Sequence, residues 1–163
     1  MNEVASEARR YGLATAGEMA GKTGLQILQA MIAGELPAPR ISRTLDFLLV
    51  EIDEGRAVFE GAPTAEHENP AGTVHGGYLA TLLDSCMTCA AQSTARGGEF
   101  FTTVELKVSF LRPVAPGAGL VRAEGKVIQK SRRTAFAEGR LTDPRGRLLA
   151  HATTTCMVVD PRG

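Results

Sequence analysis

The feature that most constrains this chain is a long apolar segment with one charge in its middle. Between Gly76 and Ala95 the only charged side chain is Asp84, and leucine, alanine, cysteine and methionine fill many of the other positions. A helix that is apolar on nearly all sides is typically surrounded by protein. We therefore expect one long buried helix, ending at Arg96-Gly97-Gly98, where a glycine can adopt the left-handed conformation of a C-cap.

Strand-like segments lie on both sides of this helix in the sequence. They are separated by turns rich in glycine, proline and aspartate, and they span residues 45–52, 57–61, 102–111, 120–129, 134–141 and 148–159. Two strands, a long helix and four strands predict an α+β fold, in which an antiparallel sheet of about six strands wraps around the helix.

The strand at 102–111 has a regular alternation of residue types. Val104, Leu106, Val108 and Phe110 are expected on one face, because successive side chains of a strand point to opposite faces. The polar residues between them, which include Thr103, are expected on the other face. The alternation predicts that one face of this strand packs on an apolar layer.

The N-terminal part of the chain is expected to be an extension, residues 1–40, ahead of a single domain at 41–160. Residues 1–23 show no periodicity; they are expected to be loosely ordered and are given no function. Apolar residues from Leu25 to Ile32 recur at helical spacing, with Gly34 as a stop, which predicts a short amphipathic helix.

Composition narrows the class of protein. The 163 residues suit one domain with its own core,. The 18 basic and 18 acidic residues are scattered, which argues against nucleic acid as a partner. Three cysteines give no disulfide framework,, and neither a secretory signal nor an apolar stretch of membrane-spanning length is present. We expect a cytoplasmic protein without a membrane partner.

Asp84 is the residue most in need of an explanation. Burying a lone carboxylate costs several kcal/mol unless hydrogen bonds or charges compensate. The helical repeat places Asp84 on a stripe of small and polar residues with Gly77, Ala80, Thr81 and Thr88,. Either Asp84 is structural, capping a loop or pairing with an arginine, or it faces a cleft and acts as a base or nucleophile.

The tripeptide His75-Gly76-Gly77 stands where the preceding loop becomes the helix. A helix N-terminus offers unpaired N–H groups and the positive end of the helix dipole, and glycine lets a ligand approach the backbone closely. These groups could stabilise an oxyanion that forms on a carbonyl group. An ordinary turn with a histidine is the alternative interpretation.

The separation of these two candidates implies a second copy of the chain. Asp84 lies nine residues after His75, so the helical rise of about 1.5 Å per residue separates them by roughly 13 Å. One carbonyl group cannot contact both. If both act on one substrate, Asp84 must come from a partner, which predicts a homodimer with interfacial sites.

Several motifs together resemble those of a known family. The run Asn69-Pro-Ala-Gly-Thr-Val-His75-Gly-Gly, followed by Leu83-Asp84, resembles PaaI-like hotdog-fold acyl-CoA thioesterases of the 4-hydroxybenzoyl-CoA thioesterase-like superfamily. The segments 103–113 and 131–135 also resemble this family, so the similarity covers about residues 40–160. The resemblance implies a hotdog fold, dimers that commonly form tetramers, and hydrolysis of acyl-CoA without a cofactor.

The resemblance also implies roles for individual residues. Asp84 matches the residue that attacks the thioester or activates water, and Gly76 matches the N–H that polarises the carbonyl, with Gly77 beside it. Asn69 and His75 match positions that orient the thioester and the departing sulfur.

Two further assignments are less specific. The resemblance gives Thr103 the hydroxyl that assists the acid, with Thr102 as the alternative. The turn Lys130-Ser131-Arg132-Arg133 suits the phosphates of coenzyme A, since clustered cations bind such groups; a solvated turn is the other interpretation.

Other interpretations have weaker support. Cys86 and Cys89 are better explained as small buried side chains than as a metal or redox pair, and no metal is expected. The motif Gly-x-Ser-x-Gly of serine hydrolases is missing from the sequence,. A non-catalytic acyl-CoA-binding protein is the main alternative, and a hotdog dehydratase is a third. The acyl group is not named by the sequence; Tyr78, Phe100, Phe101 and the N-terminal helix are expected to set the pocket depth.

Overall fold

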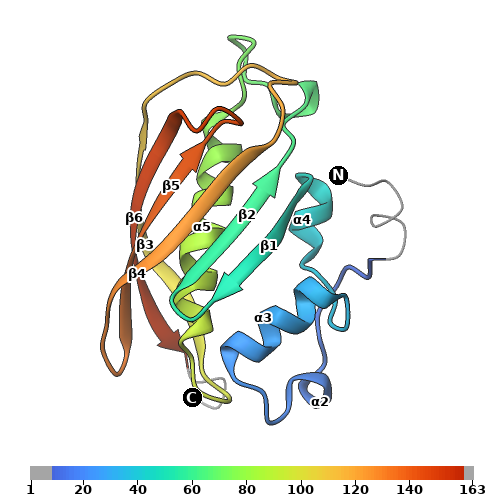
Figure 1. The fold of residues 1–163 in the computed structure, drawn as a ribbon, viewed down its shortest axis with the longest axis vertical. Helices are drawn as coiled ribbons and strands as arrows, with labels where there is room; N and C mark the ends of the chain where they lie inside the picture. The colour runs from blue at the N-terminus through green and yellow to red at the C-terminus, as the bar shows by residue number, and fades with distance from the viewer. Residues whose placement is uncertain (1–8, 160–163) are drawn as a thin grey trace.

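A computed structural model describes residues 9–159 of the chain. Its centre is a six-stranded antiparallel sheet that curves around one long helix (Figure 1). The strand order is β1-β2-β4-β5-β6-β3. The elements are β1 Phe47–Asp53, β2 Arg56–Gly61, α5 Gly76–Ser93, β3 Phe100–Phe110, β4 Val121–Lys130, β5 Thr134–Thr142 and β6 Leu148–Val159. This architecture confirms the predicted α+β hotdog fold.

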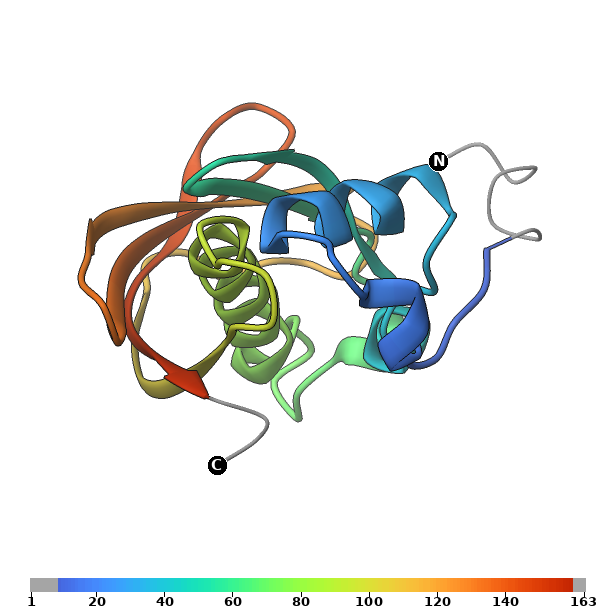
Figure 2. The same ribbon diagram turned by 90° about the horizontal axis from the view of Figure 1, so that it is seen from below.

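Helix α5 is buried because the sheet encloses it. Figure 2 shows the helix within the curve of the sheet. Leu82, Leu83, Cys86 and Met87 are fully buried and form the centre of the main hydrophobic cluster. The apolar segment of the sequence therefore folds as expected, packed on the inner face of the strands.

Close contact between α5 and the sheet depends on small residues in the strands. A Cβ atom added to Gly125 of β4 would lie 2.5 Å from the carbonyl oxygen of Cys86. On the neighbouring strand, a Cβ atom at Gly139 would lie 3.0 Å from the Met87 side chain. Gly125 therefore lets the helix backbone approach the sheet more closely than any side chain would allow, and Gly139 leaves room for the Met87 side chain,.

The N-terminal part contains more structure than its sequence pattern predicts. Helix α3 (Gly24–Ala33) confirms the predicted amphipathic helix, and it packs against β1 and α5. The expectation that residues 1–23 are loosely ordered is wrong for residues 9–23. They contain the short helix α2 (Ala16–Met19), which a capping box stabilises,. The same expectation for residues 1–8 concerns a part of the chain outside the described residues.

Two short helical segments, α4 (Arg40–Thr44) and η1 (Ala65–His67), were not predicted. They have five and three residues, too few to produce a readable periodicity.

The predicted glycine cap of the long helix is wrong. Helix α5 ends at Ser93, and the C-cap is Thr94 in a right-handed conformation. The ammonium group of Lys130 donates a hydrogen bond to the Thr94 carbonyl oxygen. Because a side chain from β4 satisfies this helix end, a left-handed cap is not required. Gly98 does adopt a positive φ of 84°, in the turn that follows.

The predicted alternation of β3 fails at its first inward position. The register with β6 shifts between Thr103 and Glu105, which identifies a β-bulge at Val104. Val104 is consequently 53% exposed, whereas Leu106 and Val108 pack on the core as predicted. A bulge adds one residue to a strand and so reverses the faces on one side of it. Thr103 therefore points towards α5, not away from it.

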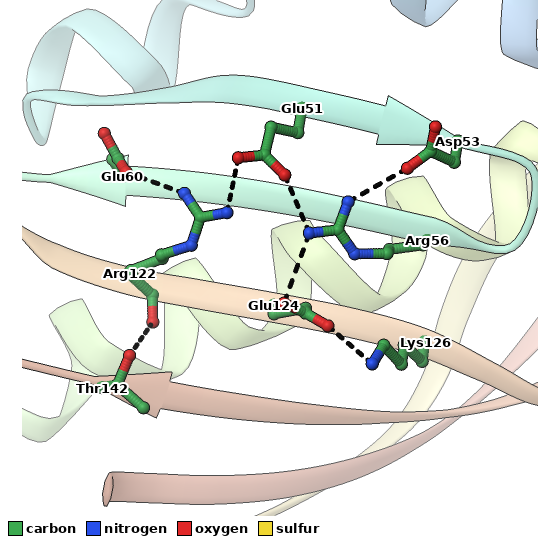
Figure 3. A network of polar contacts seen from close by, with 8 residues as sticks. All are labelled: Glu51, Asp53, Arg56, Glu60, Arg122, Glu124, Lys126 and Thr142. Atoms are coloured by element: carbon green, nitrogen blue, oxygen red, sulfur yellow. Dashed lines mark hydrogen bonds and ion pairs between the residues drawn. The ribbon is translucent and has the colours of Figure 1, made fainter. Parts of the chain in front are cut away.

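The outer face of the sheet carries a network of ion pairs across β1, β2 and β4 (Figure 3). The Arg122 guanidinium lies 2.5 Å from Glu51, and Arg56 lies 2.8 Å from the same carboxylate. Hydrogen bonds from Arg122 and Arg56 lower the pKa of the Glu51 carboxyl group. These charged rows make the outer face polar, which leaves the inner face to form the core.

None of the helices in the described part of the chain is long and apolar enough to span a membrane.

We expect Gly125→Ala to destabilise the protein, because the added methyl group would overlap the backbone of α5. Overpacking of this kind costs about 1–3 kcal/mol of unfolding free energy, occasionally more. Thermal or denaturant unfolding measures the loss. Gly17→Ala is the matched control: a Cβ atom there meets nothing within 4 Å, so this helical position should keep or slightly raise stability. Equal stability of the Gly125 variant and the wild type would contradict the packing described here.

Candidate active site

His75 is the N-cap of α5. Its side-chain Nδ1 accepts a hydrogen bond from the Gly77 N–H at 2.9 Å. The backbone N–H of His75 donates to the His67 carbonyl oxygen at 2.7 Å, which anchors the loop to the start of the helix. The imidazole therefore holds the helix N-terminus in shape, and the Gly77 N–H is already bonded within the chain.

The Gly76 N–H differs from its neighbour. Among the described residues it donates to no acceptor, as expected at the first position of a helix. Gly76 lines a pocket of about 320 Å³ together with Asn69, Phe110 and Arg112. A Cβ atom at Gly76 would lie 3.1 Å from the Phe110 ring, so the aromatic ring covers this turn closely.

Asn69 fixes the loop in front of the helix. Its Oδ1 accepts hydrogen bonds from the Ala71 and Thr73 N–H groups at 2.9 and 3.3 Å, and its Nδ2 donates to the Thr73 hydroxyl at 2.9 Å. The Asn69 amide therefore shapes one wall of the Gly76 pocket through its own loop.

Asp84 lies about two turns after Gly76 on α5 and is half-buried. The Thr103 hydroxyl donates a hydrogen bond to its Oδ1 at 2.7 Å, and the Thr88 hydroxyl lies 3.4 Å from the same oxygen. The other oxygen, Oδ2, accepts no hydrogen bond from any described residue. Thr103, and not Thr102, is thus the hydroxyl next to the acid, because the bulge at Val104 turns Thr103 inward.

The structure disfavours the interpretation that Asp84 is a structural residue paired with an arginine. Within residues 9–159 no basic side chain lies within ion-pair distance of its carboxylate. Two threonine hydroxyls are its only side-chain hydrogen-bond partners there. A structural aspartate that pairs with an arginine would have a guanidinium group within ion-pair distance. The arrangement leaves a carboxylate oxygen available at the surface of a pocket.

The pocket at Asp84 has a volume of about 320 Å³ and apolar walls. Its lining includes the rings of Phe47, Phe59 and Phe101, together with Ile41 from α4. The sequence did not single out Phe47, Phe59 or Ile41, since strand phenylalanines and a five-residue helix carry no distinctive signal. Of the residues expected to set the pocket depth, Phe101 lines it.

Tyr78, in contrast, lies in the core beside His67, with ring centroids 4.5 Å apart. Its hydroxyl has no hydrogen-bond partner among the described residues, and burial raises the pKa of this phenol. Phe100 lines neither the Gly76 pocket nor the Asp84 pocket.

The two pockets of one chain are separate. No residue that lines the Gly76 pocket also lines the Asp84 pocket. This agrees with the roughly 13 Å separation expected from the helical rise. Within a single chain, the unpaired N–H and the carboxylate thus face different cavities.

Two residues of the turn at 130–133 form contacts with other parts of the fold. Lys130 donates to the Thr94 carbonyl oxygen and lies 5.7 Å from the centre of the Phe101 ring. The Ser131 hydroxyl is 2.7 Å from that of Thr134, which stabilises the turn. The side chains of Arg132 and Arg133 are exposed.

Cys86 and Cys156 are small core residues, whereas Cys89 is half-buried and lines the Asp84 pocket. Cys86 is buried and donates to the Leu83 carbonyl oxygen. Burial raises the pKa of the Cys86 thiol and raises that of Cys89 to about 12. Neither thiol is activated as a nucleophile.

The hotdog fold and the carboxylate in its pocket are compatible with an enzyme that acts on thioesters, and similarity to known proteins identifies this class. Residues 71–150 match the model of the thioesterase superfamily. The chain is 30% identical over 132 residues to acyl-coenzyme A thioesterase 13 of Homo sapiens, covering 80% of this chain and 93% of that protein. The chain belongs to the thioesterase superfamily and is a thioester hydrolase.

Two further relatives are informative. The solved structure of a phenylacetic acid degradation-related protein from Ralstonia eutropha is 32% identical, with a TM-score of 0.74, covering 80% of this chain and 98% of that one. The 1,4-dihydroxy-2-naphthoyl-CoA hydrolase of Listeria monocytogenes is 25% identical, covering 75% of this chain and 98% of that protein. Family membership favours hydrolysis over the alternative of a non-catalytic binding protein.

Proposed function

We propose that the protein hydrolyses acyl-CoA thioesters to a free acid and coenzyme A, at sites shared by two copies of the chain. The observation that carries this proposal is the Asp84 carboxylate, held by the Thr103 hydroxyl on the wall of an apolar pocket. Its relatives include an acyl-coenzyme A thioesterase and an aromatic acyl-CoA hydrolase.

In this mechanism the Gly76 N–H donates a hydrogen bond to the thioester carbonyl oxygen and stabilises the negative charge that develops on it. Asp84 either takes a proton from the attacking water or attacks the carbonyl carbon itself. The tetrahedral intermediate then collapses, the carbon–sulfur bond breaks, and coenzyme A leaves as a thiolate that takes up a proton. When water attacks, its oxygen enters the acid directly and the acid is released. When Asp84 attacks, loss of the thiolate leaves an anhydride between the acyl group and Asp84, and a water molecule then hydrolyses this anhydride to the free acid and the Asp84 carboxylate.

The remaining predicted residues support this geometry. Thr103 bonds Oδ1 of Asp84 and so directs Oδ2 to the substrate. His75 and Asn69 hold the helix start and its loop, from where they orient the thioester and the departing sulfur. The exposed Arg132 and Arg133 are the residues we propose for the phosphates of coenzyme A,.

The edge strand β3 supports the shared site. It is the last strand of the sheet, so one of its edges has no strand partner among residues 9–159, and an unpaired edge can pair with a second copy. The beginning of β3, at Phe101–Thr103, lines the Asp84 pocket. Its end at Phe110 lines the Gly76 pocket.

Antiparallel pairing of two β3 strands about a two-fold axis would place the beginning of one strand beside the end of the other. Each Asp84 pocket would then adjoin the partner's Gly76 pocket. The exposed apolar side chains of Val104, Phe110 and Leu111 would be covered by the same contact. Two identical sites follow from the symmetry, in a homodimer or in a tetramer of two such dimers.

Asp84→Asn should abolish most of the activity, because the amide has the shape of the acid but cannot accept a proton. We expect kcat to fall by about 10²–10⁴ for whichever of phenylacetyl-, benzoyl- and fatty acyl-CoA the wild type hydrolyses, measured as thiol release. Asp53→Asn, on the exposed outer face, is the matched control and should retain wild-type turnover. Full activity of the Asp84 variant would refute its role.

Gly76→Pro tests the oxyanion donor, because proline lacks the N–H but is well tolerated at the first position of a helix. His75 already has φ −61° and ψ 135°, a conformation that suits a residue before proline. We expect kcat to fall by about 10²–10³. Gly76→Ala adds bulk against Phe110 but keeps the N–H, so it should lose far less. Equal losses in the two variants would point to crowding instead of a missing donor.

Mixing the two inactive variants tests the shared site. A dimer of one Asp84→Asn chain and one Gly76→Pro chain contains one site in which both groups are intact. After unfolding and refolding an equal mixture, we expect about a quarter of the wild-type activity. Each variant refolded alone gives the baseline. Recovery of no activity from the mixture, with dimers present, would place both groups of a site on the same chain.

A further inference from the structure

The N-terminal segment folds back on itself and fixes the position of helix α4. The Gly12 N–H donates to the Ala38 carbonyl oxygen, and the Ala38 N–H donates to the Arg10 carbonyl oxygen, both at 2.9 Å. The guanidinium of Arg43 lies 5.9 Å from the centre of the Tyr11 ring. Contacts just before α4 and within it therefore tie the helix to residues 10–12.

Helix α4 forms one wall of the Asp84 pocket. Pro39, Ile41 and Ser42 line this pocket, and so do Asp84 and Phe101 from the central fold. Figure 1 shows α4 beside β1. The wall thus comes from a segment far before the catalytic helix in the sequence, and it lies outside the 71–150 region that matches the superfamily model.

Ile41 is an unusual part of this wall. It is 49% exposed, although an isoleucine gains free energy when an apolar partner covers it. Its neighbour Ser42 is only 3% exposed, so α4 is seated firmly while Ile41 remains open to the pocket. The side chain is therefore positioned to contact whatever apolar group lies next to Asp84.

We infer that Ile41 of α4 is a specificity-determining residue, which limits the length of the acyl group that reaches Asp84. This inference rests on the proposed function, because the acyl group is taken to occupy the Asp84 pocket. Apolar atoms make up most of the pocket wall, and the apolar lining residues include Pro39, Ile41, Phe47 and Phe101. Such walls suit an uncharged acyl group, and a larger or smaller residue 41 changes the space available to it.

Two substitutions with opposite effects test the inference. Ile41→Ala enlarges the pocket and Ile41→Phe reduces it. We measure kcat/KM for butanoyl-, octanoyl- and dodecanoyl-CoA. The Ala variant should raise the ratio of kcat/KM for dodecanoyl-CoA to kcat/KM for butanoyl-CoA about tenfold or more. The Phe variant should lower this ratio by a similar factor. Changes of this size are expected when a pocket gains or loses room for a methylene group. Because Ile41 is half-exposed, thermal unfolding should be nearly unchanged in both variants.

Leu13→Ala is the matched control. Leu13 is also an apolar residue of the N-terminal segment, is 85% exposed, and does not line the Asp84 pocket; its chain-length profile should equal that of the wild type. If both Ile41 variants also keep the wild-type profile while hydrolysis continues, the inference is wrong and the proposed function stands. A wild-type protein that hydrolyses no acyl-CoA would overturn the proposed function, and this inference with it.

Discussion

The close packing of α5 on the sheet is the contact on which the rest of the structure depends. At Gly125 the helix backbone touches the strand so closely that a methyl group would not fit. Side chains from several strands then surround the helix, and its position and rotation are fixed. Because α5 carries both Gly76 and Asp84, this packing also fixes where the Gly76 N–H and the Asp84 carboxylate lie. Helix α5 therefore both forms the centre of the core and carries the two candidate site residues.

A buried helix tolerates Asp84 because the surrounding fold gives its carboxylate hydrogen-bond donors. The bulge at Val104 turns the Thr103 hydroxyl inward to Oδ1, and Thr88 lies one turn further along the helix. Both donors are uncharged, so the carboxylate is held in place without being neutralised by a cation. A strand irregularity, which costs regular pairing at one residue, thereby shapes the candidate site.

The proposed shared site depends on the two pockets along β3, which lie at different places on one chain. One pocket contains the unpaired Gly76 N–H, and the other contains Asp84. Since β3 is an edge strand with exposed apolar side chains, a second copy can complete both pockets by pairing there. Helix α4, which contacts β1, adds a wall to the Asp84 pocket.

The amino-acid sequence alone was enough to predict the long buried helix and the six strands in their order along the chain, and to select Gly76 and Asp84 as candidate site residues. These features depend on local spacing: an apolar segment broken by one carboxylate, and strands marked by alternation and turns. Three features became visible only in the folded chain: Thr103 faces Asp84, Lys130 donates a hydrogen bond to the end of α5, and Ile41 borders the pocket. The sequence has no periodic pattern that marks these features, because each depends on contacts between residues far apart in the chain. They are a bulge, a helix cap supplied by a distant strand, and a five-residue helix.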